Sequence, residues 1–333
     1  MYKKTTQSVN YQGITDSIIE LMEAGTLPMG SQWETGRNKM LPFNLNSGKM
    51  YRGINVIQLW VREMNMGYKS NGWITINQMR AIGKEEGNPV KLITLPDDAP
   101  NRSDNKTGQS GIAVFHADSF IPKEWKRQNA GDKGDIFRSE KTGEFNDEKY
   151  IRRNYLKVVG TVFNLDQIEN LPEKYQKFDS LLPLEDVAPE ITAMTNSYGV
   201  PINLSPNGSC YYVPSEHEIF LVHQNQFKTP EDFERVKFHE LVHSTGHKTL
   251  LNRTLTGSDR TKETYAFEEL CAELGAAFLC AHYGIPGLMV HANYLEHYLK
   301  VLRNDNKAIF KAAAKAQAAV ELLTSHIPKK EET

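Results

Sequence analysis

The segment His239-Glu240-Leu241-Val242-His243 constrains this chain more than any other five residues. On a helix, His239 and His243 lie one turn apart on one face, so both imidazoles can reach a single metal ion. Glu240 lies beside them, where its carboxylate can take a proton from water. This spacing is typical of the two-histidine half of a zinc hydrolase site. The segment therefore predicts a metal-bearing helix that also carries a general base.

The flanking residues favour a short packed helix with defined ends. Thr229 is a good N-cap, Pro230 suits the first helical position, and two acids follow in the first turn. Gly246 comes soon after His243, where a left-handed C-terminal cap would end the helix. We therefore expect the helix to begin near residue 230 and to end near residue 246.

A catalytic zinc ion needs a third protein ligand. Residues 265–278 read as a buried helix rich in small residues, on which Glu269 and Glu273 lie one turn apart. Such a pair can supply one ligand and one carboxylate that orients a ligating histidine. We predict Glu269 as the ligand and Glu273 as the carboxylate behind it, and the reverse assignment stays open. Glu268 points elsewhere and is predicted to be solvated.

Two residues near the motif are candidates for stabilising an oxyanion. His247 follows Gly246, so it cannot share the helical face of the two predicted ligands. Tyr265 begins the glutamate-bearing segment. The residues do not decide between these two candidates.

Composition limits the class of protein. A chain of 333 residues is long for one compact domain, and two are expected. No run of 18 apolar residues occurs, and the N-terminus lacks the apolar core of a signal peptide, so we expect a cytoplasmic protein without a membrane partner. Cys210, Cys271 and Cys280 are few and lack a C-x-x-C pattern, which favours buried thiols over disulfides or cysteine ligation.

Charge is distributed unevenly along the chain. Of 39 Lys and Arg residues, 23 lie within 1–157, together with 18 of the 41 Asp and Glu residues. The first part is therefore mildly basic and the remainder is acidic. This asymmetry indicates which half to search for contacts with nucleic acid.

Local patterns predict a mixture of helices and strands. Apolar periodicity predicts helices over 14–24, 54–66, 75–82, 186–197 and 305–324, with Gly83 as the cap of the third. Apolar or alternating runs predict strands over 90–95, 112–116, 156–163, 211–213 and 218–222. Residues 97–110 and 128–148 read as polar loops. We therefore expect an α+β chain with two domains, over 1–172 and 186–326, and a boundary around 172–188.

The order of these motifs resembles that of ArdC-type antirestriction proteins, which are found on plasmids and phages. In the front half the likeness rests on Tyr51-Arg52-Gly53-Ile54-Asn55, Trp73-Ile74-Thr75 and Gly160-Thr161-Val162-Phe163-Asn164. In the back half it rests on 238–247 and on 268–278, which contain the histidine motif and the glutamate pair. The likeness covers nearly the whole chain in one order.

The resemblance implies a mixed α/β domain that binds single-stranded DNA, followed by a mostly helical zincin-like metallopeptidase domain with a small sheet. The implied role is protection of incoming DNA from host restriction, with Zn²⁺ as cofactor and an unknown peptide substrate. A host restriction protein or another DNA-bound protein is a second expected partner. Two alternatives stay open: a DNA-binding protector with a structural metal domain, and a DNA-scaffolded protease.

Binding of single strands uses cations for the phosphates and aromatic faces for the bases. Tyr51 and Arg52 lie in a loop between polar turns, and they are the first candidates. Trp60 lies inside a predicted helix and reads as a core residue. The full set of candidate DNA contacts is Lys49, Tyr51, Arg52, Tyr68, Lys69, Trp73 and Arg80.

Overall fold

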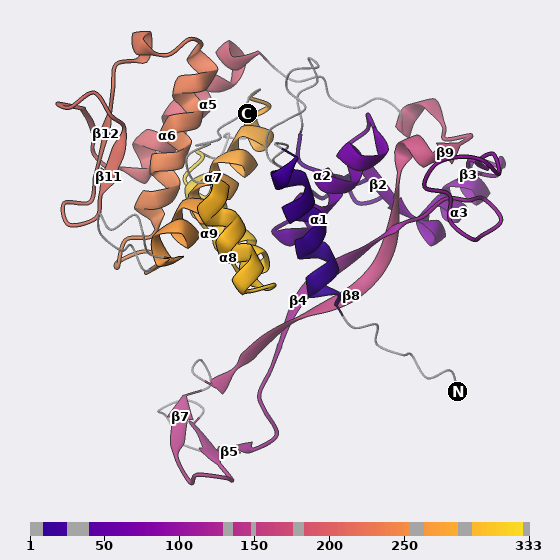
Figure 1. The fold of residues 1–333 in the computed structure, drawn as a ribbon, viewed down its shortest axis with the longest axis horizontal. Helices are drawn as coiled ribbons and strands as arrows, with labels where there is room; N and C mark the ends of the chain where they lie inside the picture. Colours follow the sequence, from indigo (N-terminus) through magenta and orange to yellow (C-terminus); the bar gives the residue numbers. More distant parts are fainter. Residues whose placement is uncertain are drawn as a thin grey trace. The chain divides into compact units, whose positions relative to one another are not determined.

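The computed structural model of the chain describes residues 9–24, 40–128, 136–147, 151–175, 183–253, 263–285 and 295–328 (Figure 1). The chain forms two compact units. The smaller contains residues 1–10 and 113–161, and the larger contains 11–112 and 162–333. Helices and small sheets occur together, as the predicted α+β class requires.

The front part of the larger unit combines three helices with short strands. Its helices are α1 (Tyr11–Glu23), α2 (Ile54–Met66) and α3 (Ile76–Glu85), and its strands are β1 (Phe43–Asn44), β2 (Gly72–Thr75), β3 (Lys91–Leu92) and β9 (Ile168–Glu169). Strand β2 pairs in parallel with β1 and antiparallel with the last residues of β8 (Arg153–Asn164). Strand β3 pairs antiparallel with β9.

Helix α3 illustrates how the sequence positions this part. Thr75 and Gln78 form a capping box at its start. The expected stop at Gly83 was wrong, because the helix continues to Glu85 and Gly83 lies inside it. A Cβ at Gly83 would lie 2.7 Å from the backbone nitrogen of Val90. Glycine is therefore needed for close approach of the following chain, not for ending the helix.

The back part of the larger unit is mostly helical. Its helices are α5 (Leu184–Tyr198), α6 (Pro230–Thr245), α7 (Glu263–Tyr283), α8 (Leu295–Asn304) and α9 (Ala308–Thr324). Its small sheet has the order β10-β12-β11, from β10 (Ile202–Leu204), β12 (Glu218–Leu221) and β11 (Tyr211–Val213). Helix α8 and strand β10 had not been predicted. Helix α7 lies against both α6 and α9 (Figure 1).

Front and back helices share one core inside the larger unit. The rings of Tyr11 and Phe310 meet edge to face with centroids 4.7 Å apart, and those of Trp60 and Phe278 do so at 5.9 Å. Trp60 is buried, as predicted for a core residue. The domain boundary expected around 172–188 stays a prediction, and residues 176–182 lie outside the described residues.

The smaller unit is made of strands. These are β4 (Ile112–Phe120), β5 (Trp125–Gln128), β6 (Ile136–Ser139), β7 (Phe145–Asp147) and most of β8. Strand β6 pairs antiparallel with both β5 and β7. The prediction of a loop throughout 128–148 was wrong in its described part, because residues 136–139 and 145–147 form antiparallel strands.

The remaining sequence-based assignments agree with the structure to within a few residues. The helices expected near 14–24, 54–66, 186–197 and 305–324 are α1, α2, α5 and α9. Among the residues that the structure describes, no helix has the length and hydropathy needed to cross a lipid bilayer.

Candidate metal centre

Helix α6 presents the two histidines as the sequence predicted. Thr229 and Asp232 form a capping box, and Pro230 occupies the first turn. The expected left-handed cap at Gly246 was wrong, because its φ and ψ are −73° and −8°. Its N–H instead donates to the carbonyls of the last helical turn, and the chain leaves the helix in a tight right-handed turn.

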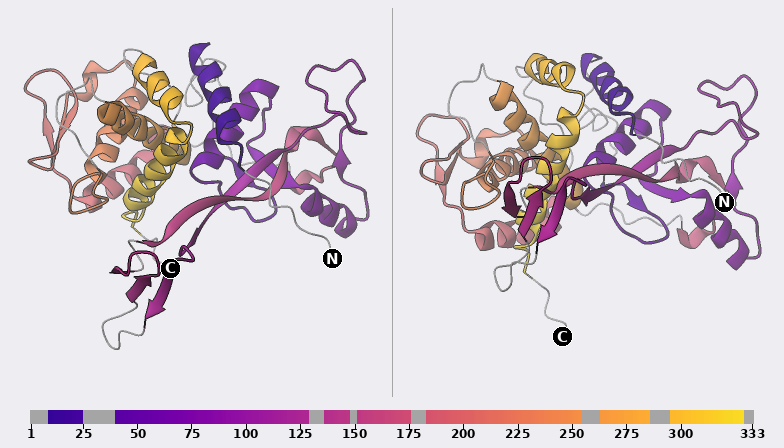
Figure 2. Two further views of the ribbon diagram at one scale, coloured as in Figure 1. Left: turned by 60° about the horizontal axis from the view of Figure 1, so that its bottom comes forward. Right: turned by 90° about the horizontal axis from the view of Figure 1, so that it is seen from below.

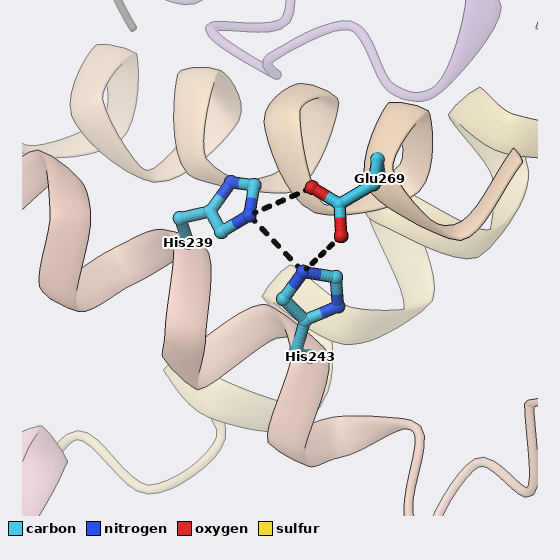
Figure 3. Close-up of side chains that lie close together, drawn as sticks. All are labelled: His239, His243 and Glu269. Atoms are coloured by element: carbon cyan, nitrogen blue, oxygen red, sulfur yellow. Dashed lines mark hydrogen bonds and ion pairs between the residues drawn. The ribbon is translucent and has the colours of Figure 1, made fainter. Parts of the chain in front are cut away.

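Three potential ligand atoms converge between α6 and α7 (Figure 3). The Nε2 atoms of His239 and His243 lie 3.0 Å apart. The Glu269 carboxylate oxygens lie 3.5 Å from Nε2 of His239 and 3.4 Å from Nε2 of His243. Tetrahedral bonds of about 2.0–2.1 Å require ligand atoms about 3.3–3.4 Å apart. The three side chains therefore fit a single small divalent ion.

The close approach of α6 and α7 depends on a small residue. A Cβ placed on Gly275 would lie 2.8 Å from both methyl carbons of Val242. Val242 belongs to the turn that carries His243, and Gly275 follows the turn that carries Glu269. Glycine at 275 therefore lets the two helices bring their polar side chains together.

A carboxylate lies near the other ring nitrogen of each histidine, within hydrogen-bond distance for His243 and slightly beyond it for His239. Glu273 Oε1 lies 3.9 Å from Nδ1 of His239, and Glu268 Oε1 lies 3.3 Å from Nδ1 of His243. An acceptor at Nδ1 favours the tautomer whose Nε2 lone pair faces a metal. Glu269 is grouped with the two Nε2 atoms, while the assignment of Glu269 as ligand and Glu273 as the carboxylate behind it stays a prediction.

The prediction that Glu268 is solvated was wrong. Its carboxylate is buried and accepts two bonds from Nε and one from Nη2 of Arg253, at 2.8–3.2 Å. Arg253 is itself buried and also donates to Thr245 Oγ1 and to the Val242 carbonyl. Sequence reasoning gave Glu268 no role at the site and did not identify Arg253, since nothing in the sequence distinguishes Arg253 from a surface arginine.

The charges of the cluster of His239, His243 and Glu269 favour a bound cation. Burial alone would lower the pKa of His243, but hydrogen bonds to Glu268 and Glu269 outweigh it and raise the pKa to about 10. Burial would raise the pKa of Glu269, but the two histidines hold it well below its ordinary value. The site therefore favours positive charge between the carboxylates, which is the property that a cation site needs.

The other predicted catalytic residues lie on α6, on α7 or just after α6. Glu240 is buried on α6, and its charge contributes to raising the pKa of His243. Tyr265 is half-buried on α7. The His247 ring stacks on His217 with centroids 4.3 Å apart, and its Nδ1 lies 2.8 Å from Thr249 Oγ1.

The predicted DNA contacts do not form one surface of exposed side chains. Trp73 has no exposed surface, and its indole N–H donates to Glu63 at 3.1 Å, so the prediction that it stacks on bases was wrong. Tyr68 is half-buried and packs edge-on to Trp73. The three cations Lys49, Lys69 and Arg80 are exposed.

The Tyr51-Arg52 loop lies against helix α9. The Arg52 guanidinium forms an ion pair with Glu321, and the N–H of the next residue, Gly53, donates to Gln317 Oε1 at 3.0 Å. Tyr51 is half-buried, and its hydroxyl accepts from Asn44 Nδ2 at 3.4 Å. Arg52 remains 63% exposed, so a ligand could still reach it.

Comparisons with known proteins cover both parts of the chain. Residues 8–163 match the N-terminal domain of the anti-restriction factor ArdC, and residues 189–315 match a zincin-like metallopeptidase. A zincin-like domain implies a divalent metal, and the cluster of His239, His243 and Glu269 has the donors for one.

Curated relatives include much longer proteins. A DNA primase TraC of Escherichia coli is 30% identical over 92% of this chain, which spans 26% of the primase's length. An uncharacterised Sinorhizobium fredii protein, y4eC, is 28% identical over 92% of this chain and 89% of its own length. The chain thus corresponds to about a quarter of that primase.

Solved structures match over nearly the whole chain. The metal-free crystal structure of the antirestriction ArdC protein from plasmid R388 is 32% identical, with a TM-score of 0.69, and covers 96% of this chain and 98% of its own. The Mn(II)-bound structure of that protein has a TM-score of 0.67 at 30% identity, covering 97% of this chain and 100% of its own.

Proposed function

The chain belongs to the ArdC antirestriction family, and we propose that it binds single-stranded DNA, carries a zinc peptidase site and protects incoming plasmid DNA from host restriction. This function would be exercised in the cytoplasm of a bacterial host. The observation that carries the catalytic part is the convergence of His239, His243 and Glu269 beside the buried carboxylate of Glu240.

We assign zinc to the Nε2 atoms of His239 and His243 and to the Glu269 carboxylate. Two imidazoles and one carboxylate are a common protein ligand set of catalytic zinc. Glu268 and Glu273 would hold the imidazoles in the tautomer that presents Nε2. When bound, the ion supplies Lewis acidity toward water and a peptide carbonyl.

Glu240 is assigned the role of general base. Its carboxylate would accept a proton from the attacking water and donate it to the leaving amine. Glu240 is buried on the same helix as the two histidines, so its carboxylate is held close to the proposed ion. Tyr265 and His247 stay the candidates for donating a hydrogen bond to the oxyanion.

The DNA-binding part of the proposal rests on the family and on exposed cations of the front part. Lys49, Lys69 and Arg80 are available for phosphate contacts, and Arg52 would have to exchange Glu321 for a phosphate. Contacts of this kind release counterions, so affinity should fall steeply with salt.

Glu240→Ala tests the proposed function directly. The variant should keep zinc and single-strand binding but lose cleavage of a peptide library. Protection is then measured as the transformation efficiency of unmodified plasmid into a restricting host. Loss of protection supports a catalytic role, including that of a DNA-scaffolded protease. Full protection by the variant would leave a DNA-binding protector with a structural metal domain.

A further inference from the structure

Strands β4 and β8 form a two-stranded ribbon in the smaller unit (Figures 1 and 2). Side chains alternate between the faces of a strand, so Arg153, Tyr155, Lys157 and Val159 of β8 share one face. All four are exposed. Large apolar side chains are among them, since Tyr155 is 40% exposed and Val159 is 57% exposed.

An aromatic pair occupies this face. Phe120 of β4 is 47% exposed, and its ring meets that of Tyr155 edge to face with centroids 5.7 Å apart. The Tyr155 hydroxyl donates to Asp118 Oδ2 at 3.1 Å, which fixes the orientation of the ring. The two rings are therefore positioned in advance while still open to solvent.

Cations flank the aromatic pair. Arg153 and Lys157 lie two residues before and after Tyr155, which places each about 7 Å away along the strand. Asp118 is the acid on this face, and its carboxylate accepts from Tyr155 and from the Ser119 N–H at 2.8 Å. Lys157 and His116 are both close enough to stabilise its charge. The face therefore alternates cation, aromatic ring and cation.

We propose that this ribbon face is a binding site for single-stranded DNA, with bases stacked on Phe120 and Tyr155 and phosphates held by Arg153 and Lys157. The proposal rests on the single-strand binding proposed above, and it adds to that binding a second surface, which the Tyr51-Arg52 loop does not include. Exposed rings favour unpaired bases, because the faces of bases in a duplex are already stacked.

The observations favour a single strand over other occupants. An interface with protein would bury Arg153 and Lys157 beside the rings, and charged residues are depleted at the centre of such interfaces. A nucleic acid instead pairs each of these cations with a phosphate while its bases cover the rings. The alternation of cations and an aromatic ring along β8 thus complements the alternation of phosphates and bases along a single strand.

The test measures binding of a fluorescent 20-nucleotide single strand and of the matching duplex to the full chain. Phe120→Ala with Tyr155→Ala should weaken single-strand binding by about tenfold or more. Arg153→Ala and Lys157→Ala should each make the slope of log affinity against log salt concentration shallower by about 0.7, because each removes one phosphate contact. Tyr155→Phe keeps the ring and should retain most of the affinity.

Two matched controls separate this surface from general effects. Leu204 is 69% exposed on β10, so Leu204→Ala removes an exposed apolar side chain elsewhere. Lys126 pairs with Glu140 in the smaller unit, so Lys126→Ala removes a cation of the same unit that the proposal does not use. Both variants should bind like the parent protein, and circular dichroism and metal content should be unchanged throughout.

Two results would overturn the inference, and they are distinguishable from each other. If the parent binds single strands and the Phe120/Tyr155 variant binds equally well, the ribbon site is wrong while the proposed function stands. If the parent binds no single strand, both fail. Sedimentation of the same proteins tests self-association as the alternative use of this surface. That alternative predicts a dimeric parent and a monomeric Phe120/Tyr155 variant, with equal DNA binding by the two.

Discussion

Arg253 and Glu268 form a buried ion pair directly behind His243, one of the two histidines of the candidate metal centre. The guanidinium reaches both oxygens of the carboxylate and also the end of helix α6. Glu268 thereby links the conformation of the chain after α6 to the orientation of His243. Removing either partner should affect both folding and metal binding.

Arg253→Met should destabilise the chain by about 3–5 kcal/mol, because it leaves the Glu268 charge buried without its partner. Urea denaturation measures this change. Arg303→Met is the matched control, since Arg303 pairs with Glu23 at an exposed position and its loss should cost less than about 1 kcal/mol. Equal effects of the two substitutions would contradict the importance of the buried pair.

The three buried glutamates of α7 should differ in their effect on metal affinity. Glu269→Gln should cause the largest loss, because it changes a ligand, whereas Glu268→Gln and Glu273→Gln should each weaken binding by about 10- to 100-fold. Competition with a chromophoric chelator gives the three dissociation constants. A larger loss for Glu273→Gln than for Glu269→Gln would reverse their assignments.

Gly275→Ala should disturb the metal centre without touching a ligand. The new methyl group would meet both methyls of Val242, and relief of that overlap should cost about 1–3 kcal/mol and separate α6 from α7. Adding Val242→Ala should recover much of the metal affinity. A double-mutant cycle on metal binding measures this coupling, and strictly additive effects would count against helix spacing as the cause.

Metal affinity should rise with pH through the neutral range. In the metal-free chain the pKa of His243 is about 10, so binding must displace a proton and should strengthen by up to tenfold per pH unit. Calorimetry in buffers of different ionisation enthalpy counts the protons released. A count of zero at pH 7 would show that His243 is already neutral there.

The same proton should affect the stability of the metal-free chain. The pKa of His243 is raised on folding from 6.5 to about 10, so its contribution is complete below pH 6.5 and is lost as the pH rises toward 10. With a chelator present, the difference in unfolding free energy between the parent and His243→Ala should therefore shrink from pH 6 to pH 9.5. A difference that grows would contradict the direction of the shift.

Glu321→Ala should strengthen binding of single-stranded DNA, because it frees Arg52 from its ion pair. Arg52→Ala together with Tyr51→Ala should weaken the same binding. Glu169→Ala is the charge control, since Glu169 pairs with Lys91 away from this loop. Gel shifts at low and moderate salt measure the affinities, and a Glu321→Ala effect no larger than that of Glu169→Ala would remove Arg52 from the DNA site.

Local patterns in the sequence predicted much of the candidate centre. Thr229 and Pro230 define the start of α6, and the spacing of His239 and His243 needs only helical periodicity. The burial of Glu268 was not predicted, because residues 268 and 269 point about 100° apart on α7. Both can face α6 only when α7 is turned about its own axis so that α6 lies between the two directions. That rotation depends on packing such as Gly275 against Val242, which no local pattern specifies.

The DNA surface was harder to predict for a related reason. Trp73 belongs to a strand of only four residues, and its burial depends on Glu63 of a helix that precedes it. Phe120 and Tyr155 are far apart in sequence, and only the pairing of β4 with β8 brings them together. Composition indicated the basic half of the chain, but long-range strand pairing decides which aromatic side chains are exposed.

The most direct test of the metal centre is anomalous diffraction at the zinc absorption edge from crystals of the zinc-loaded protein. We predict one peak within about 2.0–2.2 Å of Nε2 of His239, Nε2 of His243 and a carboxylate oxygen of Glu269. Glu268 and Glu273 should remain on the Nδ1 sides of the two rings. A peak bonded to Glu273 in place of Glu269, or no peak between α6 and α7, would contradict the assignment.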